Sequence, residues 1–365
     1  MLRVAQVMGK MNGGGVEAVV MNYYRHVDRS RVQFDFVVDS DSQMVPNDEV
    51  ESMGGRVFLV PPLGRLAAHQ RVLRRLFRQE GWQIVHSHRN ALSVFPLRAA
   101  KAAGVPVRIA HSHSTWGRGE LKRNAVKAIL RTQANRYPTH RMACTRHAGE
   151  WLFGRDAEFK VLYNAIELER FAFDAHVRLC LREQLGIPSD AFVVGNVGRL
   201  TFQKNQAFLV DEFARMKGAG DSRLLLVGEG PDMEMLAEKS RALGVADRVH
   251  MLGRRQDVDR LYSAMDAFCL PSNYEGLGIV AIEAQVSGVP TLVSTEVPEE
   301  AVLSNVVRVL PLSDGVWSNE LDRLRASRDA ASSRHVDLSP FRSYQIALEA
   351  PSLVSYYESA IEEAL

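Results

Sequence analysis

The sequence is poor in cysteine and has no long apolar stretch. Its three cysteines, Cys144, Cys180 and Cys269, are an odd number, widely spaced and set in apolar or helical contexts. A disulfide framework or a cysteine zinc site is therefore not expected, and all three are predicted to be buried free thiols. Because no run of 18 apolar residues is present and the amino terminus leads directly into a strand, we expect no membrane span, no signal peptide and a cytoplasmic location.

Net charge is also nearly absent, at +2, but it is unevenly distributed. Residues 1–170 hold 26 Lys and Arg against 15 Asp and Glu, whereas the remainder holds 19 against 28. Two expected basic helices carry much of the excess: one has Arg71, Arg74, Arg75 and Arg78 beside an apolar arc of Val72, Leu73, Leu76 and Phe77, and the other has Arg118, Lys122, Arg123, Lys127 and Arg131. Peripheral contact with an anionic membrane and an ordinary solvated helix face both explain this pattern.

Apolar runs of strand length alternate with helix-length segments along the whole chain. The expected strands are Leu2–Val7, Phe34–Val38, Val57–Val60, Ile84–His86, Val107–Ala110, Lys160–Leu162, Val193–Val197, Leu224–Val227, Val249–Leu252, Ala267–Leu270, Thr291–Val293 and Val307–Leu310. Such runs indicate parallel sheets covered on both faces. Since 365 residues exceed one ordinary core, we predict an α/β protein of two Rossmann-like, doubly wound domains, at residues 1–170 and 171–348, followed by a helix at 349–365.

One segment places two carboxylates eight positions apart around a glycine-rich turn, Glu275-Gly-Leu-Gly-Ile-Val-Ala-Ile-Glu283. Its turn, Gly276 to Gly278, presents backbone N–H groups at the start of an expected helix, which is an anion site suited to a diphosphate. Glu283 is placed further along the helix to accept hydrogen bonds from ribose hydroxyls. Upstream, the strand ending at Gly198 delivers Arg199 and Lys204 to the same region. The combined pattern indicates a sugar nucleotide.

These elements resemble the retaining glycosyltransferases of family 4, which carry G-R-x-x-x-x-K and E-x7-E elements in the second of two Rossmann-like domains. The chain is also similar to this family at Gly13-Gly-Gly-Val-Glu17, Val227-Gly-Glu-Gly-Pro231 and His250-Met-Leu-Gly253. It departs from the common pattern at Tyr163-Asn-Ala-Ile-Glu167 and at Leu277, where Phe is common. The resemblance implies the GT-B fold, in which two domains face each other across a cleft and the last helix packs back on the first domain.

The resemblance also implies roles for single residues. Arg199 and Lys204, with the amides of Gly276 to Gly278, would stabilise charge on the β-phosphate, so no metal or cofactor is expected. Glu275 would bind donor-sugar hydroxyls, and Glu283 the ribose. The catalytic set is His113, Glu275, Arg199 and Lys204, with His111 as an alternative to His113. The donor-binding set adds Gly14, Gly15, Glu229, Leu252, Arg254, Gly276, Leu277, Gly278 and Glu283.

The implied activity is transfer of a hexosyl or N-acetylhexosaminyl unit, with retention, from a nucleotide diphosphate sugar, in the first instance a UDP-sugar. The acceptor would be a hydroxyl of a glycan or lipid-linked sugar in capsular, exopolysaccharide or cell-wall glycan assembly. Two alternatives remain open: a nucleotide-sugar epimerase of the same fold, and a non-catalytic nucleotide-binding subunit of a polysaccharide assembly complex. No nucleic acid partner is expected.

Three further motifs suggest other chemistry. Gly13 to Ala18 satisfies G-x-G-x-x-A, but five residues separate it from the strand, which argues against a nicotinamide dinucleotide site. Asp39-Ser-Asp41 is an Asp-x-Asp pattern of metal-dependent transferases, and we interpret it as a solvated loop. His86-Ser-His88 and His111-Ser-His113 each put two imidazoles on one strand face, where a metal site is conceivable but has no acidic ligand to complete it.

Overall fold

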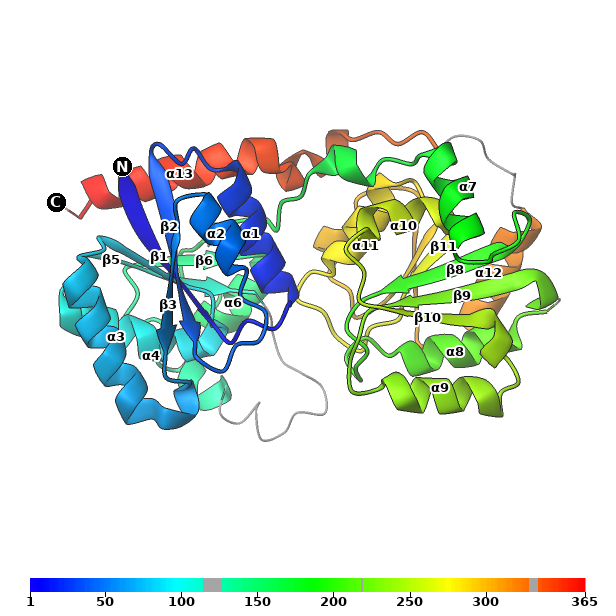
Figure 1. Ribbon diagram of the computed structural model, residues 1–365, viewed down its shortest axis with the longest axis horizontal. Coiled ribbons are helices and arrows are strands. Elements are labelled where there is room, and N and C mark those ends of the chain that lie inside the picture. The colour runs from blue at the N-terminus through cyan, green and yellow to red at the C-terminus, as the bar shows by residue number, and fades with distance from the viewer. Residues whose placement is uncertain (114–126, 218, 328–333, 365) are drawn as a thin grey trace. The chain divides into compact units, whose positions relative to one another are not determined.

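A computed structural model describes residues 1–113, 127–217, 219–327 and 334–364. The chain divides into two compact units, drawn in Figure 1. Unit 1 comprises Met1–Ile166 and Ser343–Leu365, and unit 2 comprises Glu167–Arg342. Each unit has one parallel sheet with helices on both faces, which confirms the predicted α/β class with two doubly wound domains.

Unit 1 contains a seven-stranded sheet in the order β3-β2-β1-β4-β5-β6-β7. Its elements are β1 (Leu2–Gly9), α1 (Gly15–His26), β2 (Val32–Asp39), α2 (Asn47–Ser52), β3 (Arg56–Val60), α3 (Leu66–Glu80), β4 (Ile84–Ser87), α4 (Val94–Ala103), β5 (Val107–Ser112), β6 (His140–Ala143), α6 (Arg146–Phe153), β7 (Lys160–Val161) and α13 (Ile346–Glu362). Sequence analysis missed β6, because its residues His140 and Arg141 are partly exposed and form no apolar run.

Alternation along the strands sends successive side chains to opposite faces of this sheet. Val4 of β1 and Phe34 of β2 point into a core shared with α1 and α13. The next residue of β1, Ala5, points into a second core covered by α3, α4 and α6. A strand buried on both faces needs apolar residues at nearly every position, which explains the continuous apolar runs of the sequence.

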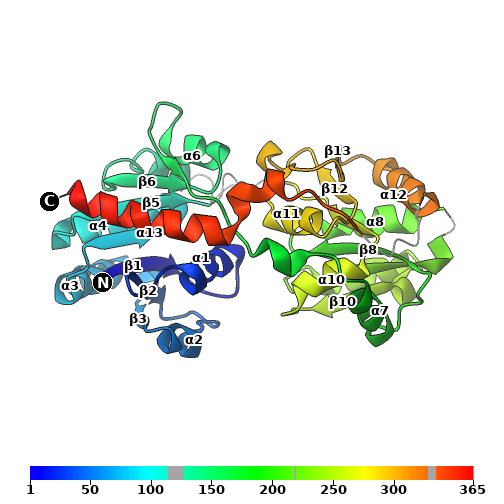
Figure 2. The same ribbon diagram turned by 90° about the horizontal axis from the view of Figure 1, so that it is seen from above.

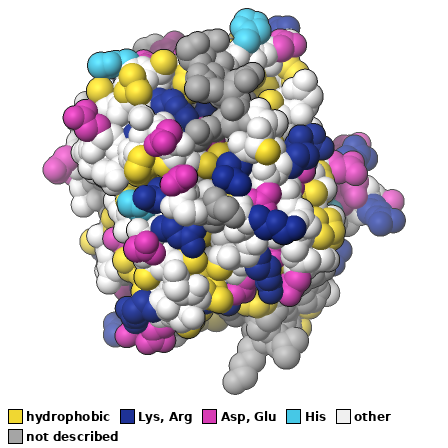
Figure 3. Space-filling view, turned by 90° about the vertical axis from the view of Figure 1, so that its right-hand side faces the viewer, with side chains coloured by type: hydrophobic (Ala, Val, Ile, Leu, Met, Phe, Trp, Pro, Cys, Tyr) yellow, Lys and Arg dark blue, Asp and Glu magenta, His cyan; other side chains and the backbone are white. Residues whose placement is uncertain are grey.

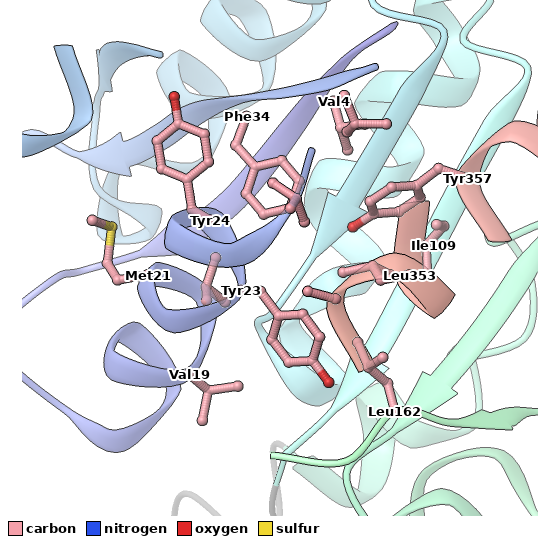
Figure 4. Close-up of a cluster of buried hydrophobic side chains, with 14 of the residues drawn as sticks. Val4, Val19, Met21, Tyr23, Tyr24, Phe34, Ile109, Leu162, Leu353 and Tyr357 are labelled. Carbon is pink, nitrogen blue, oxygen red and sulfur yellow. The ribbon is translucent and has the colours of Figure 1, made fainter. Parts of the chain in front are cut away.

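Helix α13 belongs to unit 1 although it follows unit 2 in the chain. It lies beside α1 on one face of the sheet, as Figures 1 and 2 both show. Leu353 and Tyr357 of α13 reach the core near Tyr23 of α1 and Phe34 of β2 (Figure 4). The rings of Tyr357 and Phe34 meet edge to face, with centroids 6.2 Å apart. Burial of such side chains stabilises a fold by roughly 1.5–3 kcal/mol each, so α13 is an integral part of unit 1.

Unit 2 contains a six-stranded sheet in the order β10-β9-β8-β11-β12-β13. Its elements are α7 (Ala175–Gln184), β8 (Phe192–Val197), α8 (Gln206–Arg215), β9 (Ser222–Val227), α9 (Met233–Ala242), β10 (Val249–Gly253), α10 (Val258–Ala264), β11 (Ala267–Leu270), α11 (Ile279–Val286), β12 (Thr291–Ser294), β13 (Val307–Leu310) and α12 (Val316–Ala326). On the face drawn in Figure 3, Lys and Arg side chains are interspersed with Asp and Glu.

The basic helix α3 turns its apolar arc inward. Leu73 and Phe77 are buried in the core of unit 1, and Val72 and Leu76 pack against that core. The amphipathic pattern of α3 is therefore accounted for by the fold itself. Arg118, Lys122 and Arg123 of the second basic segment lie outside the described residues. Every helix of the described ranges is too short or too polar to cross a lipid bilayer.

The cysteines do not all occupy the interior. Cys144 and Cys269 are buried free thiols, as predicted. The prediction was wrong for Cys180, which is exposed on α7 next to His176, with the sulfur 3.5 Å from the imidazole Nε2. Helix α7 packs against α10 with only part of its surface, and the apolar neighbour Leu179 is also 60% exposed.

Candidate functional site

The carboxyl ends of two neighbouring strands form the first part of the candidate site. In unit 2, β8 pairs with β9 on one side and β11 on the other, so the chain leaves this point toward opposite edges of the sheet. Open α/β sheets bind ligands at such a topological switch point. Residues 198–204, with the G-R-x-x-x-x-K motif, follow β8, and Glu275 follows β11. The two motifs therefore lie at one edge of one sheet.

Hydrogen bonds fasten these two loops to each other. Asn273 N donates to Gln203 O at 2.8 Å, and Asn273 Nδ2 donates to Phe202 O at 2.7 Å. In the other direction, Gln203 Nε2 donates to Tyr274 O at 3.2 Å. Sequence reasoning missed both Asn273 and Gln203 because nothing in a sequence spacing shows that two loops 71 residues apart share hydrogen bonds. Their proximity to predicted site residues was the available signal.

Lys204 and Glu275 form an ion pair at this junction. Lys204 Nζ lies 2.6 Å from Glu275 Oε1, and the two side chains are only 16% and 6% exposed. Ser272 Oγ donates to the same carboxylate oxygen at 2.6 Å. A charge this buried needs a partner, so the pair holds both side chains in defined positions. An incoming phosphate would compete with Glu275 for the Lys204 ammonium.

Glu283 lies in the second turn of α11, which begins after Gly278 at a φ of +81°. Tyr262 Oη donates to Glu283 Oε2 at 2.7 Å. Glu283 is half-buried as a residue, and burial of its carboxyl group raises the pKa of that group to about 7. Both protonation states of Glu283 are therefore populated near neutral pH. Tyr262, on α10, belongs to no motif, and sequence analysis did not identify it.

Two glycines allow the loops after β8 and β9 to touch. A Cβ atom at Gly228 would lie 2.1 Å from Gly198 O, and one at Gly230 would lie 2.0 Å from Leu200 O. Backbone atoms cannot yield to such contacts, so both positions require glycine. Between them stands the exposed residue Glu229, whose backbone oxygen accepts from Leu200 N at 2.9 Å. Glu229 thus lies at the same sheet edge as Lys204.

The other predicted residues of unit 2 differ in exposure. Arg199 is exposed at the start of the loop after β8, and Arg254 is exposed just after β10. Leu252, in β10, is half-buried. Leu277, between the glycines of the turn, is only 3% exposed, so its side chain packs into the interior of unit 2.

In unit 1, the glycine loop before α1 already surrounds an anion. The backbone N–H groups of Asn12, Gly13 and Gly14 all donate to the Glu17 carboxylate, at 3.0, 2.5 and 2.8 Å. Consecutive amides that converge in this way form an anion-binding concavity. Gly15 begins α1 and has open space around its Cα. The predicted approach of Gly14 to a diphosphate would therefore place the phosphate in competition with Glu17.

The two His-Ser-His motifs come together in the core of unit 1. His86 Nε2 lies 3.1 Å from His111 Nδ1, and His88 Nδ1 lies 3.0 Å from His113 Nε2. Burial lowers the pKa of His86 and of His113 to about 3, so both rings are neutral at pH 7. His111 is 1% exposed and His113 is 7% exposed.

The Asp39-Ser-Asp41 segment is only partly the solvated loop that we predicted: Ser40 and Asp41 are exposed, but Asp39 is buried at the end of β2. Asp39 is 3% exposed and forms an ion pair with Arg89, with Oδ2 and Nη2 3.0 Å apart. Arg89 follows β4 and reaches across β1 to the end of β2, a contact that sequence analysis missed. Asp41 is exposed and pairs with Lys10 at 2.9 Å. Because the Asp39 carboxylate is paired with Arg89 and the Asp41 carboxylate with Lys10, the two carboxylates do not act together on one ligand.

Comparison with known proteins covers both units. The model of the glycosyl transferases group 1 matches residues 178–310, and that of the glycosyl transferase 4-like domain matches residues 14–164. The putative glycosyltransferase EpsF of Bacillus subtilis (strain 168) is 35% identical over 339 residues, which cover 89% of this chain and 88% of EpsF. An Escherichia coli UDP-Gal:alpha-D-GlcNAc-diphosphoundecaprenol alpha-1,3-galactosyltransferase is 28% identical over 257 residues, 66% of each chain.

Solved structures share the architecture. Anabaena HepE in complex with UDP and glucose superposes with a TM-score of 0.82 at 19% identity, covering 98% of this chain and 100% of HepE. WaaG, a glycosyltransferase involved in lipopolysaccharide biosynthesis, superposes with a TM-score of 0.71 at 16% identity, covering 100% and 98%. At such identities the likeness establishes the fold, and the predicted GT-B architecture is confirmed.

Proposed function

We propose that this chain, which belongs to the family of glycosyl transferases group 1, is a retaining enzyme that moves a hexosyl or N-acetylhexosaminyl unit from a UDP-sugar to an acceptor hydroxyl. The observation that carries the proposal is the buried Lys204–Glu275 pair at the switch point of unit 2. It offers a cation for a leaving diphosphate and a carboxylate for sugar hydroxyls within 2.6 Å of each other.

In this mechanism the nucleoside diphosphate leaves with its charge held by the protein. Lys204, Arg199 and the amides of residues 276–278 stabilise the negative charge that grows on the β-phosphate, so a divalent metal is not required. Glu275 binds sugar hydroxyls and favours the cationic transition state. The departing phosphate itself takes the acceptor proton on the same face of the sugar. His113, buried and neutral at pH 7, would lie near the sugar without adding a charge there.

The names of similar proteins support UDP and a lipid-linked acceptor. HepE binds UDP and UDP-glucose, and the Escherichia coli relative transfers galactose from UDP-Gal to a diphosphoundecaprenol-linked sugar. We therefore propose a UDP-sugar donor, a lipid-linked sugar or glycan acceptor, and a place in exopolysaccharide, capsular or cell-wall glycan assembly at the inner face of the membrane. A non-catalytic role has less support because the motif residues are intact.

The proposal is tested by titrating the purified protein calorimetrically with UDP, GDP, ADP, UDP-sugars and NAD, with and without EDTA. Tight UDP binding that EDTA leaves unchanged is the expected result. Preference for NAD, or a requirement for a divalent metal, would contradict it. Incubation of the bound UDP-sugar without an acceptor distinguishes an epimerase, which would change the sugar, from a transferase, which would not. The anomeric configuration of the product, read by NMR, tests retention.

Glu283 predicts a pH dependence of donor binding. Its pKa of about 7 means that the carboxylate, the stronger acceptor for ribose hydroxyls, is lost as the pH falls from 8 to 6. We expect UDP-glucose affinity to fall up to about tenfold over that range, and Glu283→Gln to bind about 10- to 100-fold more weakly at pH 8. Calorimetry with UDP-glucose measures both changes without interference from a terminal phosphate proton. A Glu283→Gln variant that keeps the pH dependence would contradict the assignment.

The outer face of α3 predicts a purely electrostatic contact with anionic lipid. Arg71, Arg74, Arg75 and Arg78 are all exposed, while the apolar arc of the helix is used by the core. Each arginine near an anionic surface contributes about 1 kcal/mol, so flotation with anionic vesicles should occur at low salt and decline with added salt. Replacing all four arginines by glutamine should abolish flotation. Equal flotation with neutral vesicles would refute this contact.

A further inference from the structure

Six polar side chains from four elements form one buried cluster in unit 1. They are Gln6 of β1, His86 and His88 at the end of β4, His111 and His113 at the end of β5, and Tyr357 of α13, all at most 7% exposed. The strand residues are spaced by two from Val4, Ile84 and Ile109, which lie in the core beneath α1 and α13. The period of two along a strand therefore turns all five toward Tyr357.

These side chains form one continuous chain of hydrogen bonds. From one end, His113 Nε2 lies 3.0 Å from His88 Nδ1, His88 Nε2 lies 2.8 Å from Gln6 Oε1, and Gln6 Nε2 lies 3.2 Å from Tyr357 Oη. Beyond the tyrosine, Tyr357 Oη lies 2.7 Å from His86 Nδ1, and His86 Nε2 lies 3.1 Å from His111 Nδ1. The two terminal nitrogens, His113 Nδ1 and His111 Nε2, are buried and have no partner among the described residues. Their rings are stacked, with centroids 3.9 Å apart, so the chain nearly closes on itself.

The direction of the hydrogen bonds follows from the amide of Gln6. Its oxygen can only accept, so His88 Nε2 carries a hydrogen and His88 Nδ1 accepts from His113 Nε2–H. That leaves His113 Nδ1 as a lone-pair acceptor. All bonds are then donated in one direction around the chain, and this direction fixes the tautomer of each ring.

The other half of the chain ends in the opposite way. Gln6 Nε2 donates to Tyr357 Oη, so the tyrosine hydrogen is free to go to His86 Nδ1. His86 Nε2–H then donates to His111 Nδ1, which leaves His111 Nε2–H as a free donor. If the Gln6 amide is turned over, every bond reverses, and the ends again present one donor and one acceptor. In either direction the four histidines share one tautomer.

We propose that a single buried water molecule bridges His111 Nε2 and His113 Nδ1 and closes the six side chains into a ring. Water is the smallest group that donates one hydrogen bond while accepting another, as the two ends require. A cavity of about 10 Å³ is lined by all six side chains together with Val19, Val20, Tyr23, Phe34, Leu162 and Leu353. A cavity must offer roughly 10–15 Å³ to the centre of a water-sized sphere to hold one water molecule, which is about the volume found here.

A divalent metal is the rival occupant, because ring nitrogens of His86, His88 and His111 lie within 4.8 Å of one another. A metal needs a lone pair from every ligand. The hydrogen-bond chain leaves a lone pair at one end only, and both ring nitrogens of His86 and of His88 are already engaged. Binding through these rings would break hydrogen bonds that now satisfy buried groups. The geometry therefore favours water.

The ring makes Gln6 and Tyr357 positioning residues for His113. Through His88 and the bridging water, these two residues determine which nitrogen of His113 carries its hydrogen and hold the His113 imidazole in one orientation. The effect on catalysis rests on the proposed function, in which His113 lies near the sugar. The bridging water and the shared tautomer are independent of it and can be tested without any substrate.

The test uses the full chain with ¹⁵N-labelled histidine, studied by long-range ¹H–¹⁵N correlation at pH 7. We expect four neutral rings of one tautomer, each with one pyrrole-type and one pyridine-type nitrogen, assigned through His→Gln variants. Tyr357→Phe opens the ring at the hydroxyl, so the ¹⁵N signal of His86 Nδ1 should move, while the four rings, still joined through the bridging water, should keep one tautomer. Tyr23→Phe is the matched control, because the Tyr23 side chain lines the same cavity but its hydroxyl donates to Tyr163 O at 2.6 Å, so the His86 signal should not move.

Other outcomes would overturn the proposal. Opposite tautomers at His111 and His113, a charged imidazolium in the cluster, or loss of the shared tautomer in Tyr357→Phe would each contradict the ring. Added Co²⁺ that produces a visible ligand-field band in the wild type, absent in His86→Gln, would establish a metal site instead. A crystal structure that resolves ordered waters should show one within hydrogen-bond distance of both terminal nitrogens.

Discussion

Replacing Lys204 by alanine is expected to lower kcat about 100- to 1,000-fold. Loss of one preorganised donor to a developing negative charge costs roughly 3–4 kcal/mol of transition-state stabilisation. The donor KM should change much less, because most contacts to the nucleotide involve other residues. Steady-state kinetics with a UDP-sugar and a lipid-linked acceptor, together with calorimetric donor binding, separate the two effects.

The control for this variant is Lys239→Ala. Lys239 is also in an ion pair of unit 2, with its Nζ 2.7 Å from Asp211 Oδ1, and both of those side chains are about 30% exposed, at 28% and 31%. It lies on α9, away from the loops after β8 and β11. Equal losses in Lys204→Ala and Lys239→Ala would show that the effect is general destabilisation. Unchanged kcat in Lys204→Ala would remove the residue from the catalytic set.

Acidification from pH 7 to pH 5 is expected to destabilise unit 1 strongly. The pKa values of His86 and His113 are about 3 in the folded chain and about 6.5 in an unfolded one. The unfolded state therefore binds more protons below pH 6.5, and stability is lost as the pH falls from 6.5 toward 3. Each ring costs about 2 kcal/mol between pH 7 and 5, and His88 and His111 act in the same direction. The sum is a large part of a typical domain stability of about 5–15 kcal/mol.

Hydrogen exchange at pH values between 5 and 7, corrected for intrinsic rates, measures this loss in each unit separately. The titratable groups that line the cavity with these histidines are Tyr23 of α1 and Tyr357 of α13, which stay protonated over this range. Unit 2 contains His250, a histidine whose pKa burial also lowers, so a smaller loss is expected there. Equal acid sensitivity of the two units would contradict the assignment to the His cluster.

Much of the fold could be predicted because most of its strands appear in the sequence as continuous apolar runs. β8 and β11 are buried on both faces, so nearly every residue is apolar and the run can be recognised without knowledge of its neighbours. β6 escaped notice because part of it is exposed and charge is tolerated there. Cys180 and Asp39 were misplaced for a related reason: local sequence shows neither which side of a helix faces solvent nor that Arg89 comes from another strand to pair with a carboxylate.

The candidate site was predictable where a single short motif fixes the relative positions of its own residues. The turn before α11 sets the separation of Glu275 and Glu283, and the family resemblance supplied their roles. The pairing of Lys204 with Glu275, the bond from Tyr262 to Glu283 and the Glu17 carboxylate in the glycine loop were not predicted. Each depends on a side chain whose position is set by packing. The roles of the site residues stay predictions until the variants are measured.

The placement of α13 has a consequence for biosynthesis. Residues 346–362 leave the ribosome after all of residues 167–342, yet they supply Leu353, Val354 and Tyr357 to the core that β1 and α1 begin. During translation unit 2 can therefore finish folding while unit 1 still exposes apolar surface where α13 will lie. Unit 1 begins to be synthesised first but is completed last. A nascent chain halted before residue 346 leaves that apolar surface open to chaperones or aggregation.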